Sequence, residues 1–350
     1  MEYYILAFIF FYIFIFLARQ ACEYEPIFFI IGIAPLAFLA VFRGNVGTDT
    51  SAYLEIIRAT SESTELVSIE PLFYGLSAGL MFLFNNEKVV LAVFGVLITL
   101  ILLAASSKLE KSGTVFGACV IPIFYQAMTM NGVRYGLSFS IVVFATVFFL
   151  HGYRKSFFFI ALLAGLIHLS GLMLAFLFYI FFVKTIKLQM FFMVLLTGLL
   201  LAVFFSDIIL TKIPSYMDFK SPSIFSGTSI FLLSLLAIYV LGNLEGVGFY
   251  LSFRAFWIIF IVISSFVLSK FSYAGLRFQS LILFLIFLVM QYKIASENIV
   301  VKNRNYMILI FIGLLGLGFN FNNYINEEPD GESPFIPFKF VWAEQSDGLN

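Results

Sequence analysis

The chain has 350 residues, of which 62% are hydrophobic and 11% are charged. Soluble domains have roughly 45–50% and 25%, so this composition excludes an ordinary soluble protein and indicates a polytopic membrane protein. The formal net charge is zero, and no basic stripe suggests nucleic acid as a partner. The two cysteines, Cys22 and Cys119, are far apart and lack ligand-like neighbours, so neither a metal site nor a disulfide framework is predicted.

Apolar runs recur along the whole chain and predict an all-α fold in a single transmembrane domain, residues 1–350. A crossing helix needs about 20 mostly apolar residues. By that measure the predicted crossings are Tyr3–Ala18, Ile27–Phe42, Val89–Ser106, Gly113–Thr129, Val133–Leu150, Met190–Ser206, Ser229–Leu241, Phe249–Ser269, Tyr273–Gln291 and Tyr306–Phe319. The remaining residues, 321–350, are predicted to form a short outward-facing tail.

Two further apolar stretches do not fit a single ordinary crossing. Pro71–Phe84 is too short to span a bilayer, which predicts a re-entrant or interfacial segment. Phe157–Val183 has basic residues at both ends, and lysine and arginine favour the cytoplasmic side. Two short helices that meet near His168 satisfy this pattern, whereas one long tilted helix is the alternative. With two helices, the total is about 12 crossings and both termini face outward.

The segment FRGNVGTDTSAY, residues 42–53, places a dense polar cluster at the end of a predicted crossing. Its glycines allow tight turns, and Asp49 can cap a short helix that begins near Ser51. Arg43 lies at a helix end, where its side chain can extend to the interface. Alternatively, its planar guanidinium can bind a phosphate through two parallel hydrogen bonds.

Two further arginines lie within apolar segments, where charged residues are functional candidates. Arg134 opens a predicted helix after an Asn-Gly turn, so it and the helix N-terminus can form an anion site. Arg277 shares a helix face with Tyr273 and Ser280, and such a polar face points into a bundle or a wet cavity. The alternatives are extension to the interface for Arg134 and a packing hydrogen bond for Arg277.

His168 is one of two histidines, and it lies among apolar residues. Imidazole titrates near neutral pH, as a general base requires. The alternative is a packing role inside the fold. The other histidine, His151, lies near basic residues in a short loop and is predicted to be solvated.

Several of these residues belong to a pattern that resembles the EpsG-type branch of the Wzy polysaccharide (O-antigen) polymerases. The pattern consists of Arg43-Gly44-Asn45-Val46-Gly47-Thr48-Asp49-Thr50 with Tyr53, then Glu70-Pro71-Leu72-Phe73, Val133-Arg134-Tyr135-Gly136-Leu137 and Leu166-Ile167-His168-Leu169-Ser170. Arg277 and the tail residues Phe335-Ile336-Pro337-Phe338 match more loosely. The resemblance covers most of the chain in spacing and is sharpest in the first half.

The resemblance implies a membrane glycosyltransferase at the outer face of a bacterial inner membrane. It would move a growing glycan from undecaprenyl diphosphate onto a lipid-linked repeat unit, with membrane lipid and a chain-length regulator as further partners. The expected catalytic residues are His168 and Asp49. The expected ligands are Arg43, Arg134 and Arg277 for the diphosphate, and Tyr53 and Tyr273 for the substrate.

The sequence predicts neither a cofactor nor a metal. It lacks G-x-x-x-x-G-K-[ST], the motif of ATP-driven proteins, and it lacks an Asp-x-Asp pair that could hold a metal on a nucleotide sugar. A carrier diphosphate is already an activated donor. Two other functions stay open at this point: a flippase or transporter of lipid-linked oligosaccharide, and a polysaccharide ligase.

Overall fold

The structure is a computed structural model that describes residues 1–62, 70–109, 113–182, 226–246, 249–250, 252–326 and 333–343. These residues form helices joined by turns and short loops, and they contain no β-strand beyond one isolated bridge between Arg43 and Phe340. The all-α prediction is confirmed. The predicted crossing Met190–Ser206 lies outside the described residues.

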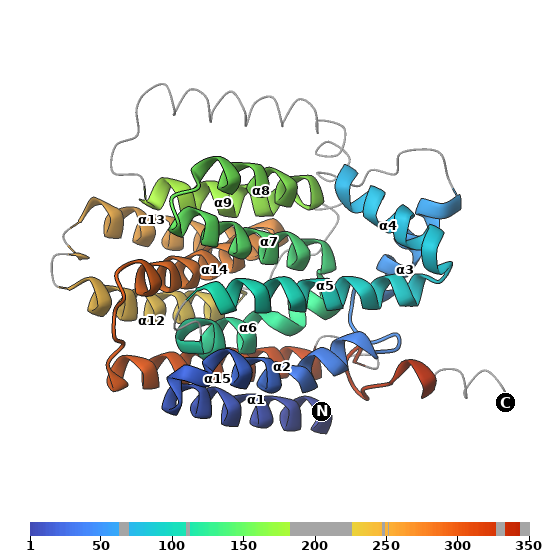
Figure 1. Ribbon diagram of the computed structural model, residues 1–350, viewed down its shortest axis with the longest axis horizontal. Coiled ribbons are helices and arrows are strands. Elements are labelled where there is room, and N and C mark those ends of the chain that lie inside the picture. Colours follow the sequence, from blue (N-terminus) through green and yellow to red (C-terminus); the bar gives the residue numbers. More distant parts are fainter. Residues whose placement is uncertain are drawn as a thin grey trace. The chain divides into compact units, whose positions relative to one another are not determined.

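The chain divides into two compact units, which Figure 1 draws together and which are described separately below. The first unit contains α1 (Glu2–Gln20), α2 (Glu25–Val41), α3 (Thr50–Glu62), α4 (Pro71–Phe84), α5 (Glu87–Lys108), η2 (Gly113–Val120), α6 (Ile121–Gln126), η3 (Ala127–Asn131), α7 (Val133–Leu150), α8 (Arg154–Ile167) and α15 (Asn303–Asn326). The second unit contains most of α9 (Leu169–Phe182), α12 (Thr228–Glu245), α13 (Phe253–Leu268) and most of α14 (Tyr273–Ser296).

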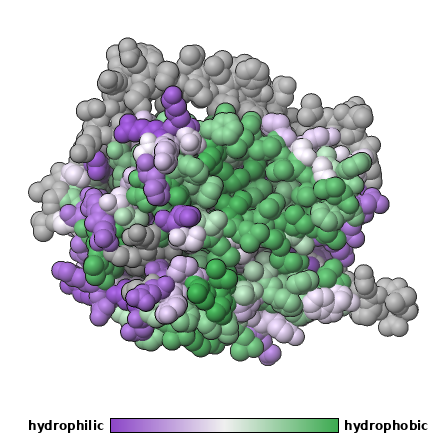
Figure 2. Space-filling model, viewed as in Figure 1, coloured by the Kyte–Doolittle hydropathy of each residue, from purple (hydrophilic) through white to green (hydrophobic). Residues whose placement is uncertain are grey.

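Six described helices are long and apolar enough to cross a membrane: α1, α5, α7, α12, α14 and α15. Large apolar side chains on these helices face outward, as Leu6 on α1 and Met307 on α15 do, with 64% and 63% of their surface exposed. Figure 2 shows the same property as a broad hydrophobic area on the visible face. Water would penalise such a surface, whereas lipid accommodates it. The chain is therefore a multi-pass membrane protein, and the total of about 12 crossings stays a prediction.

The helices of the first unit pack in a regular succession. Helix α1 packs against α2, α2 against α5, α5 against α7, and α7 against α8. Helix α15 packs against the η2–α6 segment. At this contact a Cβ atom at Gly313 would lie only 1.9 Å from the carbonyl oxygen of Ala118. Glycine thus permits two helical backbones to touch at this point. The short helices α3 and α4 pack against each other and against α5 (Figure 1).

The two irregular apolar stretches fold as short helices. Helix α4 covers Pro71–Phe84, the limits predicted for the re-entrant or interfacial segment. The stretch Phe157–Val183 divides into α8 and α9, because His168 between them has an extended backbone with φ −160° and ψ 127°. The two-helix alternative therefore holds for the described residues.

In the second unit, α12 packs against α13 through the stacked rings of Phe231 and Phe266, whose centroids are 4.3 Å apart. The start of α12 is held to α14 by Gln279, which donates from Nε2 to the carbonyl oxygen of Gly227 at 2.8 Å. Tyr273 and Arg277 lie in the first turns of α14, and both side chains are exposed.

After α15 the chain returns to the loop that follows α2. Helix α15 continues to Asn326, so the first residues of the segment predicted as a tail are helical. Beyond them, the amide of Gly44 donates to the carbonyl oxygen of Lys339 at 2.9 Å, and the amide of Gly47 donates to that of Pro334 at 2.9 Å. Residues 333–343 thus hold the polar loop of residues 42–49 from one side.

Candidate active site

Glu70 is the centre of a charged cluster in the first unit. Its carboxylate is buried, with a side-chain exposure of 4%. One oxygen, Oε2, accepts a hydrogen bond from Arg134 Nη1 at 3.0 Å, and the other, Oε1, lies 2.9 Å from His168 Nδ1. A buried carboxylate is stable only when charged or hydrogen-bonding partners compensate its lost hydration. Here two basic side chains provide them.

Glu70 reaches this position because it precedes α4 without capping it. It is the N-cap residue of α4, yet its side chain accepts no capping hydrogen bond. Pro71 follows as the first helical residue and has no N–H group to satisfy. The carboxylate is therefore available for interactions with other helices.

Helix α7 positions both partners of Glu70. Arg134 lies in its first turn, and Ser138 lies one turn later on the same face. Ser138 Oγ donates to the carbonyl oxygen of Ala164 at 2.7 Å and lies 3.1 Å from that of His168. A Cβ atom at Gly171 would lie 1.8 Å from Ser138 Oγ, so only glycine allows this approach of the chain. Through Ser138, α7 holds the break between α8 and α9, where His168 lies.

The His168 imidazole contacts Glu70 through Nδ1. Its side chain is 26% exposed, so the ring is partly accessible. A carboxylate that accepts from Nδ1–H leaves the lone pair of Nε2 available as a base, because a neutral imidazole carries one proton. The combination of a base and an orienting carboxylate matches the arrangement used in many acid–base sites.

Tyr53 and Asp49 belong to the entry of α3. The Tyr53 ring is buried, packs edge-on against Phe73 and lies under the Arg134 guanidinium at 5.8 Å, within cation–π range. Its hydroxyl oxygen accepts from the amide of Arg134 at 3.4 Å. Asp49 is half-buried directly before α3, and its carbonyl oxygen accepts from the amide of Tyr53 at 2.9 Å. The expected helix after Asp49 is present.

Arg43 lies in the loop after α2 and is almost completely buried, with 7% of its surface exposed. Its Nη1 donates to the carbonyl oxygen of Thr129, whereas Nε and Nη2 are buried without a hydrogen-bond partner among the described residues. Burial lowers the pKa of Arg43 to about 10. The side chain therefore stays protonated at neutral pH. Its burial argues against extension to the interface.

The structure brings five of the predicted site residues into the first unit: Arg43, Asp49, Tyr53, Arg134 and His168. A hydrogen bond joins Tyr53 to Arg134, and Glu70 joins Arg134 to His168. The other two predicted residues, Tyr273 and Arg277, belong to the second unit. The cluster around Glu70 is built within the first unit alone.

Glu70 is the residue that the site prediction missed. Its position was part of the recognised pattern, but no role was assigned to it. The available signal was a carboxylate immediately before a proline that opens an apolar helix. A charged side chain in such a segment is expected to pair with another residue. The basic residues Arg134 and His168 were candidates for the partner of Glu70. Within the described residues, no group of three or more His, Cys, Asp or Glu side chains is placed to hold a metal ion.

Comparison with known protein families decides the identity. The family model for EpsG matches residues 26–340, which is most of the chain and includes every predicted site residue. The chain belongs to the EpsG family. No curated protein and no solved structure matches it significantly. Membership in the EpsG family supports a polysaccharide polymerase of glycosyltransferase type, as the sequence pattern suggested.

Proposed function

We propose that this EpsG-family protein transfers a growing glycan from undecaprenyl diphosphate to the sugar of a lipid-linked repeat unit, as the Wzy polymerases do. The observation that carries the proposal is the bridge formed by Glu70 between His168 and Arg134. It supplies an oriented base beside fixed positive charge, which a transfer with a diphosphate leaving group requires.

His168 acts as the general base in this reaction. Nδ1–H donates a hydrogen bond to Glu70 and keeps its proton, while Nε2 takes the proton of the acceptor hydroxyl. The imidazolium that forms faces the Glu70 carboxylate, which stabilises its charge. Arg134 in turn gives that buried carboxylate a cationic partner and favours its charged form. Asp49, half-buried at the start of α3, is the alternative base.

The acceptor oxygen then forms a bond to the anomeric carbon of the donor glycan. The bond between that carbon and the diphosphate oxygen breaks, and its electron pair leaves on the undecaprenyl diphosphate. Fixed guanidinium groups stabilise such developing charge, and Arg43, Arg134 and Arg277 are the proposed ligands. Tyr53 and Tyr273 are proposed to contact the substrate. A donor activated by its own diphosphate needs no nucleotide, and we propose that the reaction also proceeds without a metal.

We propose that the protein lies in a bacterial inner membrane with the site facing outward, where the lipid-linked repeat units are joined. A cysteine introduced at Ser51, which is exposed, tests this orientation. We expect it to react with a membrane-impermeant thiol reagent that is added from outside. Labelling from the cytoplasmic side alone would contradict the orientation.

The function is tested with purified protein and one defined lipid-linked repeat unit, in the presence of a chelator and without nucleotide. A polymerase lengthens the glycan on the carrier, so gel or mass analysis should show a ladder of repeat units. Movement of intact repeat units across a vesicle membrane without lengthening would indicate a flippase. Transfer that occurs only when a different acceptor is added would indicate a ligase. Either result would replace the proposal.

A further inference from the structure

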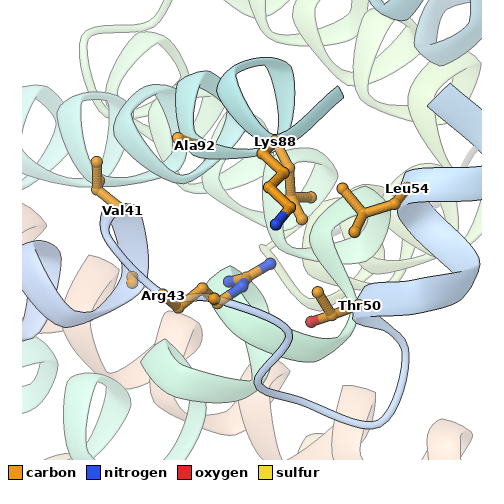
Figure 3. Close-up of a pocket in the computed structure, with 9 residues that line it drawn as sticks. Val41, Arg43, Thr50, Leu54, Lys88 and Ala92 are labelled. Atoms are coloured by element: carbon orange, nitrogen blue, oxygen red, sulfur yellow. The ribbon is translucent and has the colours of Figure 1, made fainter. Parts of the chain in front are cut away.

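A small pocket in the first unit contains a second group of basic side chains (Figure 3). Arg43, Lys88 and Thr50 line its polar side, and Val41, Leu54 and Ala92 are among the apolar residues around it. The cavity inside the pocket is small, about 10 Å³. No Asp or Glu is among its lining residues. Its charged lining is therefore purely cationic.

Arg43, one of the residues that line this pocket, has an unused hydrogen-bonding edge. Nη1 is occupied by the carbonyl oxygen of Thr129, but Nε and Nη2 have no hydrogen-bond partner among the described residues. These two nitrogens carry the parallel N–H groups of a guanidinium edge, which matches two oxygens of a phosphate or carboxylate. Leaving buried donors unsatisfied costs about 1–3 kcal/mol, and more when the group is charged. A ligand that satisfies both donors would remove that penalty.

The start of α5 adds a second positive charge. Lys88 is the second residue of α5, and Figure 3 shows its side chain directed toward the Arg43 guanidinium, with Thr50 beside that group. Asn86 fixes this helix start, because its side chain accepts from the amides of Lys88 and Val89 at 3.0 and 3.2 Å. A helix N-terminus itself carries partial positive charge. Lysine, guanidinium and helix end together favour an anion.

We infer that this pocket binds one phosphate group of the donor diphosphate, with the Nε–Nη2 edge of Arg43 as a bidentate ligand and Lys88 as a second ligand. The inference deepens the proposed function and rests on it for the identity of the donor. Ligand sites for whole small molecules occupy about 300–1,000 Å³. The space in this pocket is far smaller, so a sugar repeat unit must bind elsewhere.

The two basic clusters therefore have different main roles. Arg134 is paired with Glu70 at 3.0 Å, so it supports the base in addition to its proposed contact with the diphosphate. The Nε–Nη2 edge of Arg43 has no hydrogen-bond partner among the described residues, and Arg43 is the main ligand of the leaving group. The segment between the clusters is short: Arg43 contacts Thr129, and Arg134 is the second residue of α7, which begins shortly after Asn131. The backbone of residues 129–134 connects the phosphate ligand to the base support.

The inference is tested by binding of inorganic pyrophosphate and of geranyl diphosphate to the purified protein in phosphatidylcholine nanodiscs. We expect both to bind, and we expect Lys88→Gln to weaken binding at least tenfold, while Lys88→Arg largely restores it. Lys108→Gln is the matched control, because Lys108 is an exposed lysine at the other end of the same helix. Arg43→Gln is compared only if its melting temperature shows that it folds. Equal affinity in the Lys88→Gln and Lys108→Gln proteins would overturn the inference.

A second measurement distinguishes the donor from a phospholipid headgroup. Geranyl diphosphate should displace pyrophosphate, whereas phosphatidylglycerol added to the nanodiscs should not. Displacement by phosphatidylglycerol would overturn the donor assignment. His168→Gln separates this inference from the proposed function: we expect it to retain pyrophosphate binding while transfer is lost. If transfer is unaffected by His168→Gln but binding still depends on Lys88, the catalytic proposal fails and the phosphate site stands.

Discussion

Two charged regions of the first unit differ in how their charges are compensated. Around Glu70, each carboxylate oxygen has a basic partner, Arg134 or His168. Around Arg43, a buried guanidinium makes one hydrogen bond and leaves two nitrogens without partners in the part of the chain that the structure describes. A compensated cluster holds its own geometry without a ligand, as a catalytic base requires. An uncompensated one is completed by a ligand.

The largest expected effect is on the base. Replacing His168 with glutamine keeps one hydrogen-bonding group but removes the titratable ring. We expect the transfer rate to fall by about 10²–10⁴-fold, the usual contribution of a general base. Protein yield and donor binding should stay near wild type.

His151→Gln is the control for this prediction, because His151 is exposed in the turn after α7. It should transfer at the wild-type rate. A stable His168→Gln protein with normal turnover would remove His168 from the mechanism and direct attention to Asp49.

The next prediction compares the two arginines by stability. Arg134→Met leaves the Glu70 carboxylate buried without its guanidinium partner, and breaking a buried ion pair costs about 3–5 kcal/mol. Arg43→Met removes a buried charge whose donors are mostly unsatisfied, so its stability should match or exceed that of wild type. Melting temperatures in detergent measure both effects.

Both methionine variants should form less polymer, but for different reasons. Arg134→Met should lose activity together with stability, and Arg43→Met should lose it while remaining folded. The comparison breaks down if Arg43→Met melts well below Arg134→Met. That result would mean that Arg43 is a structural residue.

Glu70→Gln tests how the Glu70 carboxylate supports His168 as a base. Its expected effect on the transfer rate is intermediate in size. Glutamine is nearly isosteric, but it cannot provide the negative charge that stabilises the imidazolium. Hydrogen bonds to charged groups contribute about 1.5–3 kcal/mol, so we expect transfer to slow by about 10- to 100-fold. Pyrophosphate affinity should not change, because Glu70 does not line the Arg43 pocket. A parallel loss of pyrophosphate affinity would show that the Glu70 cluster and the Arg43 pocket act as one site.

The smallest expected effect is at Gly47, which shapes the loop that carries Arg43. Its φ is +112°, and a Cβ atom there would lie 2.8 Å from the Met130 carbonyl oxygen and 2.9 Å from Asn131 Oδ1. Gly152 also has a positive φ, +82°, but has no atom within 4 Å of such a Cβ. Both alanine variants bear backbone strain, and only Gly47→Ala adds a steric clash.

We therefore expect Gly47→Ala to be less stable than Gly152→Ala by about 1–3 kcal/mol, the usual cost of overpacking. It should also bind pyrophosphate more weakly, because the loop must move away from residues 130–131. Identical melting curves and affinities for the two variants would show that the loop geometry does not control Arg43.

The sequence predicted most residues of the candidate site but not their grouping. Arg43, Arg134 and His168 stood out because charged or titratable side chains are rare in apolar segments. The bridge from Glu70 to Arg134 and His168 spans 64 and 98 residues of chain, and no local pattern specifies such contacts. Lys88 gave no signal, because a lysine after an Asn cap at a helix start is ordinary.

The sequence by itself determined the membrane class and the approximate positions of the described long helices. An α-helix in lipid must satisfy its backbone hydrogen bonds within the segment, so the length of an apolar run is sufficient to predict it. Tertiary structure decided which charges are compensated. Compensation at Glu70 depends on how α4, α7 and the break between α8 and α9 at His168 pack together. The position of Arg43 depends on residues 333–343, which hold its loop. Each of these hydrogen bonds joins residues that only the fold brings within reach.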